Sequence, residues 1–430
     1  MNETTQEKLI IFTLWLLVFA SASQIMIVAP ILPRIAEELH VAKAGLGLLV
    51  TVYAVCVGIV ALITGPISDR FGRRRILLVG SGLLALALGL HGLADSYPAL
   101  LAVRALAGAA GGILSGGAVS YVGDYFPIDR RGWASGWVMS GLAAGQIAGI
   151  PLGTLLAKGF GFRAPFLAFA LLAMLAFLFI LVKLPQPPVA MSASLSLRNA
   201  LRSYRDLLRR KEVIAAAAAF VTMFMGISLF VTFFPTWLEE TLGFSTAMIS
   251  ILYLIGGVGN VAAGPQAGAL SDRIGRTRVI IVASVGTAVI MPLITLVTRD
   301  VSWLIYPLFF VMMAMVASRM SPLQALMTQL AAGSQRGALM SLVMSIGQVG
   351  FGLGSGLAAL TVSTLGFTGN ALIAMLSVMI MASIVWIHLR RFDLRPGRKG
   401  RDGSGGQASV TEPATPTYAG NADVALRNAA

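Results

Sequence analysis

Twelve long apolar runs constrain the fold of this 430-residue chain more than any other feature. Each holds about 20 residues, enough for a helix to cross the hydrocarbon of a bilayer. Backbone polar groups in lipid must be satisfied within helices or closed barrels, and these runs are too long for barrel strands. The runs occupy residues 9–32, 45–63, 76–93, 99–122, 133–157, 164–184, 213–238, 247–270, 279–297, 303–326, 338–362 and 366–387. The sequence therefore predicts an all-α polytopic membrane protein with 12 transmembrane helices.

The composition excludes a soluble globular protein. Hydrophobic residues make up 57% of the chain and charged residues only 12%, whereas a soluble domain carries about 25% charged residues. The single cysteine, Cys56, allows no intramolecular disulfide and is interpreted as a small packing residue. No Walker-type phosphate loop occurs in the sequence, which argues against ATP as the driving force.

The positive charges lie in alternate loops rather than in one patch. If the N-terminus is cytoplasmic, the cytoplasmic segments carry 25 of the 32 Lys and Arg residues and the opposite loops carry five. The remaining two, Arg104 and Arg319, lie inside spans. This asymmetry follows the positive-inside rule and predicts an inner-membrane protein with both termini in the cytoplasm. It also argues against nucleic acid as a partner, despite the net charge of +14.

The first apolar run admits a second interpretation. Lys8, an apolar stretch and then Ala20-Ser21-Ala22 resemble a signal peptide with its cleavage site. The run continues beyond that site to Leu32, however, and the seventh run is its counterpart in the second half. We therefore expect a retained helix.

Two halves of the chain repeat each other. The segment Gly65 to Arg75, GPISDRFGRRR, returns 203 residues later from Gly268 to Arg278 as GALSDRIGRTR. Further on, Arg131-Gly132 returns as Arg336-Gly337 with an offset of 205. Six runs fall in each half, which predicts two pseudo-symmetric six-helix bundles with a binding site between them near mid-membrane.

The repeat divides the chain into four segments. We assign residues 1–184 to the N-terminal bundle, 185–212 to a cytoplasmic linker, 213–392 to the C-terminal bundle and 393–430 to a disordered tail. The linker contains a basic amphipathic stretch, with Leu197, Leu201, Tyr204 and Leu208 on one face and Arg198, Arg202, Arg205 and Arg209 beside them. This stretch either lies on the anionic leaflet or is a solvated tether.

The doubled motif resembles the loop signature of the major facilitator superfamily, and the resemblance covers nearly the whole ordered chain. It implies that the loop forms a cytoplasmic gate that locks the outward-open state; the arginines alone would also suit a simple topology signal. The gate motif residues are Gly65, Asp69, Arg70, Gly72, Arg73, Arg74, Gly268, Asp272, Arg273, Gly275 and Arg276. Asp69 is expected to cap a helix or to pair with Arg130 or Arg131, and Asp124 to complete this charge network.

Two further matches resemble the drug/proton antiporter branch. In span 4, Arg104 to Gly108 is similar to an Arg-x-x-Gln-Gly motif, with Ala107 in place of Gln. In span 5 the antiporter-like residues are Gly136, Gly145, Gly149, Pro151 and Gly153. There Pro151 falls one place late and Thr154 replaces a Gly. These glycines imply either a bending helix that seals against leaks or ordinary close packing.

Intramembrane polar residues are the candidates for substrate binding and coupling. An arginine in a span usually faces a cavity or a partner, although hydrogen bonds to neighbouring carbonyls are an alternative. The candidates are Arg104, Arg319, Gln24, Asn260 and Gln324. All 18 acidic residues lie at span ends, in loops or in tails. Proton coupling would therefore need a rim carboxylate such as Asp124 or a route linked to Arg104.

The leading hypothesis is a secondary transporter, working by alternating access, that exports small amphipathic or drug-like compounds in exchange for protons. One alternative is an exchanger of an anionic metabolite that uses the cavity arginines. Another is a non-transporting membrane receptor, which would need a binding or effector domain that the sequence lacks. We expect no enzymatic activity, no catalytic residues, no cofactor and no metal. The expected partners are a small-molecule substrate, the lipid bilayer and protons, with the monomer as the functional unit.

Overall fold

The computed structural model describes residues 3–187, 197–327, 329–330 and 335–392. Within these ranges every regular element is a helix. For some residues only the backbone is described, among them Gly65, Asp69 and Arg70 of the gate motif. The predicted tail, 393–430, and residues 188–196 of the predicted linker lie outside the described part of the chain.

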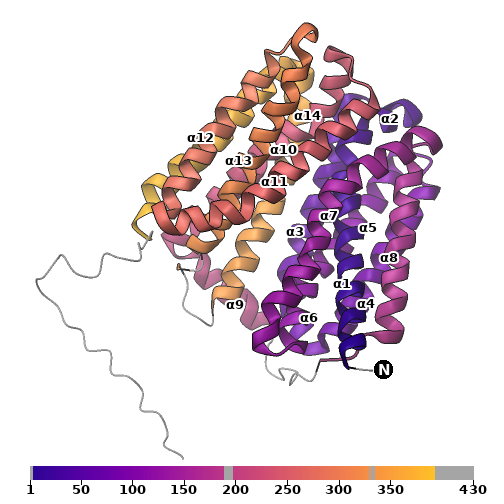
Figure 1. Cartoon of the computed structure of the whole chain (residues 1–430), viewed down its shortest axis with the longest axis vertical. Coiled ribbons are helices and arrows are strands. Elements are labelled where there is room, and N and C mark those ends of the chain that lie inside the picture. Colours follow the sequence, from indigo (N-terminus) through magenta and orange to yellow (C-terminus); the bar gives the residue numbers. More distant parts are fainter. Residues whose placement is uncertain (1–2, 188–196, 328, 331–334, 393–430) are drawn as a thin grey trace, which may run out of the picture. The chain divides into compact units, whose positions relative to one another are not determined.

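The helices fall into two groups joined by a linker helix (Figure 1). The first half holds α1 (Glu3–Met26), α2 (Val28–Leu39), α3 (Lys43–Phe71), α4 (Arg73–Leu90), α5 (Tyr97–Leu114), α6 (Gly117–Tyr125), α7 (Ile128–Phe160) and α8 (Arg163–Lys183). The linker helix is α9 (Leu197–Leu208). The second half holds α10 (Lys211–Leu242), α11 (Thr246–Ile274), α12 (Arg276–Thr295), α13 (Ile305–Met327) and α14 (Arg336–Ile384). Short 3₁₀ or π turns cover His91–Leu93, Arg299–Leu304, Val385–Leu389 and Arg390–Phe392.

Twelve crossings account for these helices, as the apolar runs predict. Eleven helical segments of the described chain are long and apolar enough to cross a membrane, and the last of them covers Gly337–Leu389. That segment contains Gly366 at φ 69°, which separates two helices inside α14. The first crossing is interrupted between α1 and α2, because Pro30 has no N–H to donate to the carbonyl of Met26. The fourth is interrupted at Ser115 and Gly116.

The two halves repeat the same helix packing. In the first half α1 packs on α7, α3 on α5, and α4 on α5 and α8. In the second half α10 packs on α14, α11 on α13, and α12 on α13 and α14. Each pair in one half has its counterpart in the other, so the two six-helix bundles are pseudo-symmetric in their contacts as well as in their sequence.

The halves meet through small side chains. Helix α3 packs on α14, α7 on α11 and α2 on α10. The Thr51 hydroxyl of α3 donates to the carbonyl of Gly352 at 2.7 Å, and the hydroxyls of Thr154 on α7 and Ser250 on α11 lie 2.5 Å apart. A Cβ at Gly58 would lie 2.6 Å from the carbonyl oxygen of Ser345, so the α3 and α14 backbones approach closely there.

The linker helix α9 contacts both halves. Tyr204 and Leu207 are buried in an apolar cluster of the second half, and the Tyr204 hydroxyl donates to the carbonyl of Leu62 on α3 at 3.0 Å. Arg202 and Arg205 are exposed. The predicted apolar face is correct at Tyr204 but wrong one turn later, since Leu207 is buried and Leu208 is exposed. The side chains of Leu197, Arg198 and Leu201 lie outside the described residues.

The close approach at Gly58 predicts that one added methyl group destabilises the protein at this position, but not at a glycine with open space around it. Gly58→Ala should lower the free energy of unfolding by about 1–3 kcal/mol, because the new methyl must push α3 away from α14. The measurement is thermal unfolding of the purified protein in detergent.

Gly89→Ala in α4 is the matched control, because a Cβ there has no neighbour within 4 Å among the described atoms. Its stability should be unchanged or raised by the better helix propensity of alanine. Equal stability of the two variants would contradict the close packing of α3 on α14.

Candidate functional site

Two equivalent hairpins carry the gate motif. Gly72 lies between α3 and α4 at φ 91°, and Gly275 lies between α11 and α12 at φ 104°. Their N–H groups donate to the carbonyls of Ser68 and Ser271, each at 3.0 Å. Side chains are strained at such positive φ values, which explains the glycine at this position of the motif in both halves. The first hairpin follows the second crossing and the other hairpin follows the eighth. Both therefore lie at the same end of the bundle, which we call the arginine-rich end.

In the first half, Arg73 ties three helices together. Its Nε donates to Asp124 Oδ2 on α6 at 2.7 Å, and its Nη1 donates to Ser68 Oγ on α3 at 2.9 Å. Both side chains of the ion pair are only about a quarter exposed or less, so water screens this charge-assisted bond less than a fully exposed one. Arg73 and Asp124 thus fix the start of α4 to the end of α6.

In the second half, Arg276 occupies the equivalent place with weaker partners. Its Nη1 donates to the carbonyl of Ala325 on α13 at 3.3 Å, and its Nη2 donates to Asp272 Oδ1 at 3.4 Å. The arginine again reaches the fourth crossing of its half. The acceptor on that crossing is a backbone carbonyl, whereas the first half supplies the carboxylate of Asp124.

The remaining charges of the predicted network find different partners. Arg130 pairs with Glu7 on α1 at 2.8 Å, a partner that the sequence did not suggest. Arg131 Nε donates to the carbonyl of Phe126 at 2.9 Å, and Arg74 Nη2 donates to that of Leu181 at 2.7 Å.

The side chains of Gly65, Asp69 and Arg70 lie outside the described residues, so the expected pairing of Asp69 stays a prediction. Gly268 is half-buried on α11 and Arg273 is exposed.

Arg104 is buried but satisfied. It lies on α5, 2% exposed, and its Nη1 donates to Gln24 Oε1 on α1 at 3.3 Å. Its Nε donates to the carbonyl of Leu49 at 3.4 Å, and its guanidinium carbon lies 4.4 Å from the centre of the Tyr53 ring. Gln24 Nε2 in turn donates to the Tyr53 hydroxyl at 2.9 Å. The network ties α5 to α1 and α3, and Tyr53 is a member that sequence reasoning missed.

Arg319 is buried and unsatisfied. It lies on α13 with 0% exposure, and none of its three guanidinium nitrogens has a hydrogen-bond partner among the described residues. Inserting an arginine at the centre of a membrane helix costs about 2.5–3.5 kcal/mol. A buried donor without an acceptor costs about 1–3 kcal/mol more. Arg104 and Arg319, which look alike in the sequence, therefore have opposite environments.

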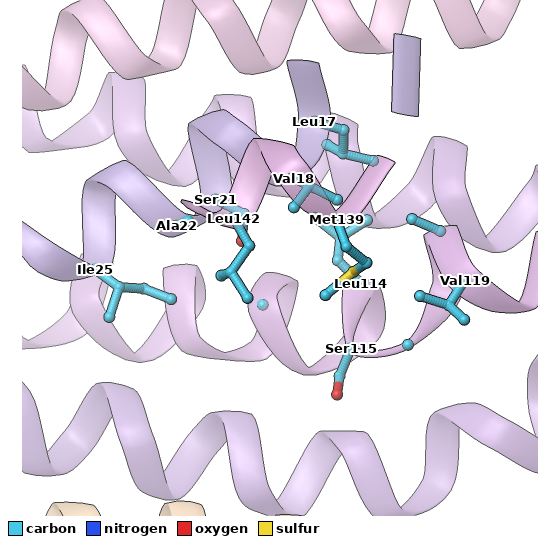
Figure 2. Close-up of a pocket in the computed structure, with 13 residues that line it drawn as sticks. Leu17, Val18, Ser21, Ala22, Ile25, Leu114, Ser115, Val119, Met139 and Leu142 are labelled. Carbon is cyan, nitrogen blue, oxygen red and sulfur yellow. The ribbon is translucent and has the colours of Figure 1, made fainter. Parts of the chain in front are cut away.

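A cavity of 220 Å³ lies in the first half, between α1, the α5–α6 break and α7 (Figure 2). Its lining is mostly apolar, with the hydroxyls of Ser21 and Ser115 as the polar side chains. The break places Gly116 at φ 73°. None of the five predicted cavity residues lines this cavity. Asn260 on α11 and Gln324 on α13 are half-buried elsewhere.

Three of the four predicted glycines of span 5 face α1 or Ile27, the residue that follows it. A Cβ at Gly145 would lie 3.0 Å from the carbonyl oxygen of Phe19, and one at Gly149 would lie 2.8 Å from Ser23. Gly153 faces Ile27, whereas Gly136 has open space and Pro151 is half-buried. The equivalent Gly350 and Gly354 of α14 approach the α10 backbone in the same way. These are contacts of close helix packing in both halves, and the bending of α7 stays a prediction.

The contrast between the two arginines predicts opposite effects of one substitution. Arg319→Met should leave the free energy of unfolding unchanged or raise it by about 1–3 kcal/mol, because it removes an unpaired buried charge. Arg104→Met should lower it by about 1–3 kcal/mol through the loss of two hydrogen bonds and a ring contact.

Thermal unfolding of both variants in the same detergent measures the difference. Loss of stability in Arg319→Met comparable to that in Arg104→Met would show that Arg319 has a structural partner.

Comparison with known proteins gives the same picture along nearly the whole chain. The family model of the Major Facilitator Superfamily matches residues 14–263 and again 217–425. Multidrug resistance protein MdtG of Enterobacter lignolyticus is 27% identical over 88% of this chain and 91% of its own length. Multidrug resistance protein 2 of Bacillus subtilis is 27% identical over 65% of this chain and 71% of its own.

A solved structure shares the fold at lower sequence identity. The D-xylose-proton symporter superposes with a TM-score of 0.73 and 17% identity, covering 90% of this chain and 98% of its own. The repeated hairpins, the matching helix contacts of the two halves and the family model agree: the chain belongs to the Major Facilitator Superfamily.

Proposed function

We propose that this protein is a secondary active transporter that exports small amphipathic compounds in exchange for protons. In this proposal it works by alternating access as a monomer in the inner membrane, with the arginine-rich end and both termini in the cytoplasm. The charge asymmetry of the loops supports that orientation. The names of the multidrug resistance relatives support the substrate class.

The observation that carries the proposal is the nature of the contact between the halves. Helix pairs α3–α14 and α7–α11 meet through glycine, serine and threonine, with short hydroxyl bonds such as Thr51 to Gly352. The ion pairs of Arg73, Arg130 and Arg276 each stay within one half. Smooth surfaces of small residues let rigid bundles rock against each other without breaking strong bonds, which alternating access requires.

Proton coupling is assigned in this proposal to the carboxylate of Asp124. It lies at the arginine-rich rim, where protons are accessible, and it holds Arg73 at 2.7 Å. Protonation would remove the charge that binds Arg73 and would loosen the tie between α4 and α6. The doubled hairpin supports a gate at this end, since an equivalent arginine in the second half is also tied to its fourth crossing.

Reconstituted transport tests the function directly. Proteoliposomes with an acidic interior and a trapped pH-sensitive dye are given ethidium, dansylamide or dansyl acid, which are a cation, a neutral compound and an anion. We expect at least one compound to enter while the interior becomes alkaline, and nigericin to abolish both signals.

Protein-free liposomes are the control. No protein-dependent flux of any of the three compounds contradicts the proposal. Flux of dansyl acid that needs an anion inside and moves no protons would instead support a second candidate, an anion exchanger, which the unpaired Arg319 favours.

The proposed gate predicts that a substitution of Asp124 changes the turnover rate but not the affinity for substrate. Asp124→Asn, which imitates the protonated carboxyl, should slow turnover several-fold and reduce its dependence on pH, while substrate affinity stays unchanged. The charge-assisted bond to Arg73 accounts for about 1.5–3 kcal/mol, enough for such a change in rate.

Asp300→Asn is the matched control, because Asp300 is exposed in the turn before α13. An Asp124→Asn protein with wild-type turnover at every pH would remove Asp124 from the gate.

A further inference from the structure

The unpaired guanidinium of Arg319 identifies the chemistry of the missing partner. All three of its nitrogens are donors, all are buried, and no described residue accepts from them. The neighbouring positions on the buried face of α13 are apolar, with Val316 one turn before and Leu323 one turn after. A charge kept in such a place is matched when an acceptor arrives from outside the chain.

The guanidinium selects among possible partners. Its planar fork suits the paired oxygens of a carboxylate, sulfonate or phosphate, which it binds through two parallel hydrogen bonds. A cationic compound would be repelled, and none of the 18 acidic residues of the sequence lies in the middle of an apolar run to compensate it. A neutral amide offers one weaker acceptor. The best partner of Arg319 is therefore an acid group.

The position of Arg319 in the repeat corresponds to a position that lines the cavity of the first half. With the offset of 205 that relates Arg131 to Arg336, Arg319 corresponds to Leu114. Leu114 lines the apolar cavity of Figure 2, directly before the break at Ser115 and Gly116. The same offset makes Pro322, inside α13, the equivalent of Gly117 at the start of α6. The fourth crossing is therefore interrupted in the first half, whereas α13 is continuous and carries Arg319 at the equivalent position.

We propose that the transported compounds are amphipathic anions, and that Arg319 holds their acid group at mid-membrane. This inference rests on the proposed transport function and narrows its substrate class. The amphipathic character is inferred from the apolar cavity of the first half, whose lining carries only two hydroxyls. Arg104 takes no part, because Gln24, Leu49 and Tyr53 already occupy its guanidinium.

A matched pair of fluorescent probes tests the proposal. Dansyl acid and dansylamide share one ring system and differ in charge, so their affinity ratio isolates the acid group. We measure both affinities on the purified full-length protein in detergent. The wild type should bind dansyl acid more tightly than dansylamide, and Arg319→Gln should reduce that preference by about tenfold or more.

Two further variants separate charge from structure. Arg319→Lys keeps a positive charge without the fork and should retain part of the preference. Arg299→Gln removes an exposed arginine that donates to the carbonyl of Thr241, and it should leave the preference unchanged. Unchanged dansylamide affinity in Arg319→Gln, together with a single peak in size-exclusion chromatography, shows that the variant is folded.

The outcomes distinguish this inference from the function on which it rests. Equal binding of the two probes, no binding of dansyl acid, or a preference that survives in Arg319→Gln overturns the inference. Proton-coupled flux of dansylamide or ethidium would then leave the transport function standing. Conversely, Arg319-dependent binding of dansyl acid without flux of any compound supports the binding site and contradicts the transport function.

Discussion

Close backbone contact holds this structure together, because lipid removes the usual driving force for burying apolar side chains. Helices in a bilayer associate mainly through dispersion contacts and hydrogen bonds, so small residues at their interfaces decide which pairs form. Glycines of α7 lie against α1, glycines of α14 lie against α10, and Gly58 of α3 lies against α14. The first two contacts build the bundles and the third joins them. The same kind of contact therefore occurs within each bundle and between the two bundles.

Polar groups inside such a bundle are either satisfied by hydrogen bonds or left without a partner. Arg104 shows the first case, with acceptors from α1 and α3 and the Tyr53 ring beneath its guanidinium. Arg319 shows the second, since no described residue accepts from it. The cost of burying a charge is similar at both sites. The contacts of Arg104 offset that cost, whereas no described residue offsets it at Arg319.

The sequence predicts what depends on periodicity, length and repetition. The twelve crossings and the duplicated halves follow from the apolar runs and from the 203-residue repeat. The motif marks Gly72 and Gly275, but their positive φ is known only from the structure. The sequence does not predict which side chains meet, because that depends on the rotation of each helix about its axis. Glu7 and Tyr53 were missed as partners for this reason, and α9 buries Leu207 where its pattern favoured Leu208. Arg104 and Arg319 could not be separated without their neighbours.

The linker helix has a consequence for the energy balance of the molecule. Tyr204 donates a hydrogen bond to the first half and Leu207 packs in an apolar cluster of the second, so α9 links the two halves through noncovalent contacts. A single neutral hydrogen bond contributes only about 0.5–1.5 kcal/mol. A bond of that strength breaks readily under thermal motion, and yet it is enough to shift the equilibrium ratio of two conformations several-fold. The linker helix α9 thus also contributes to the free energy that holds the two halves together at this end.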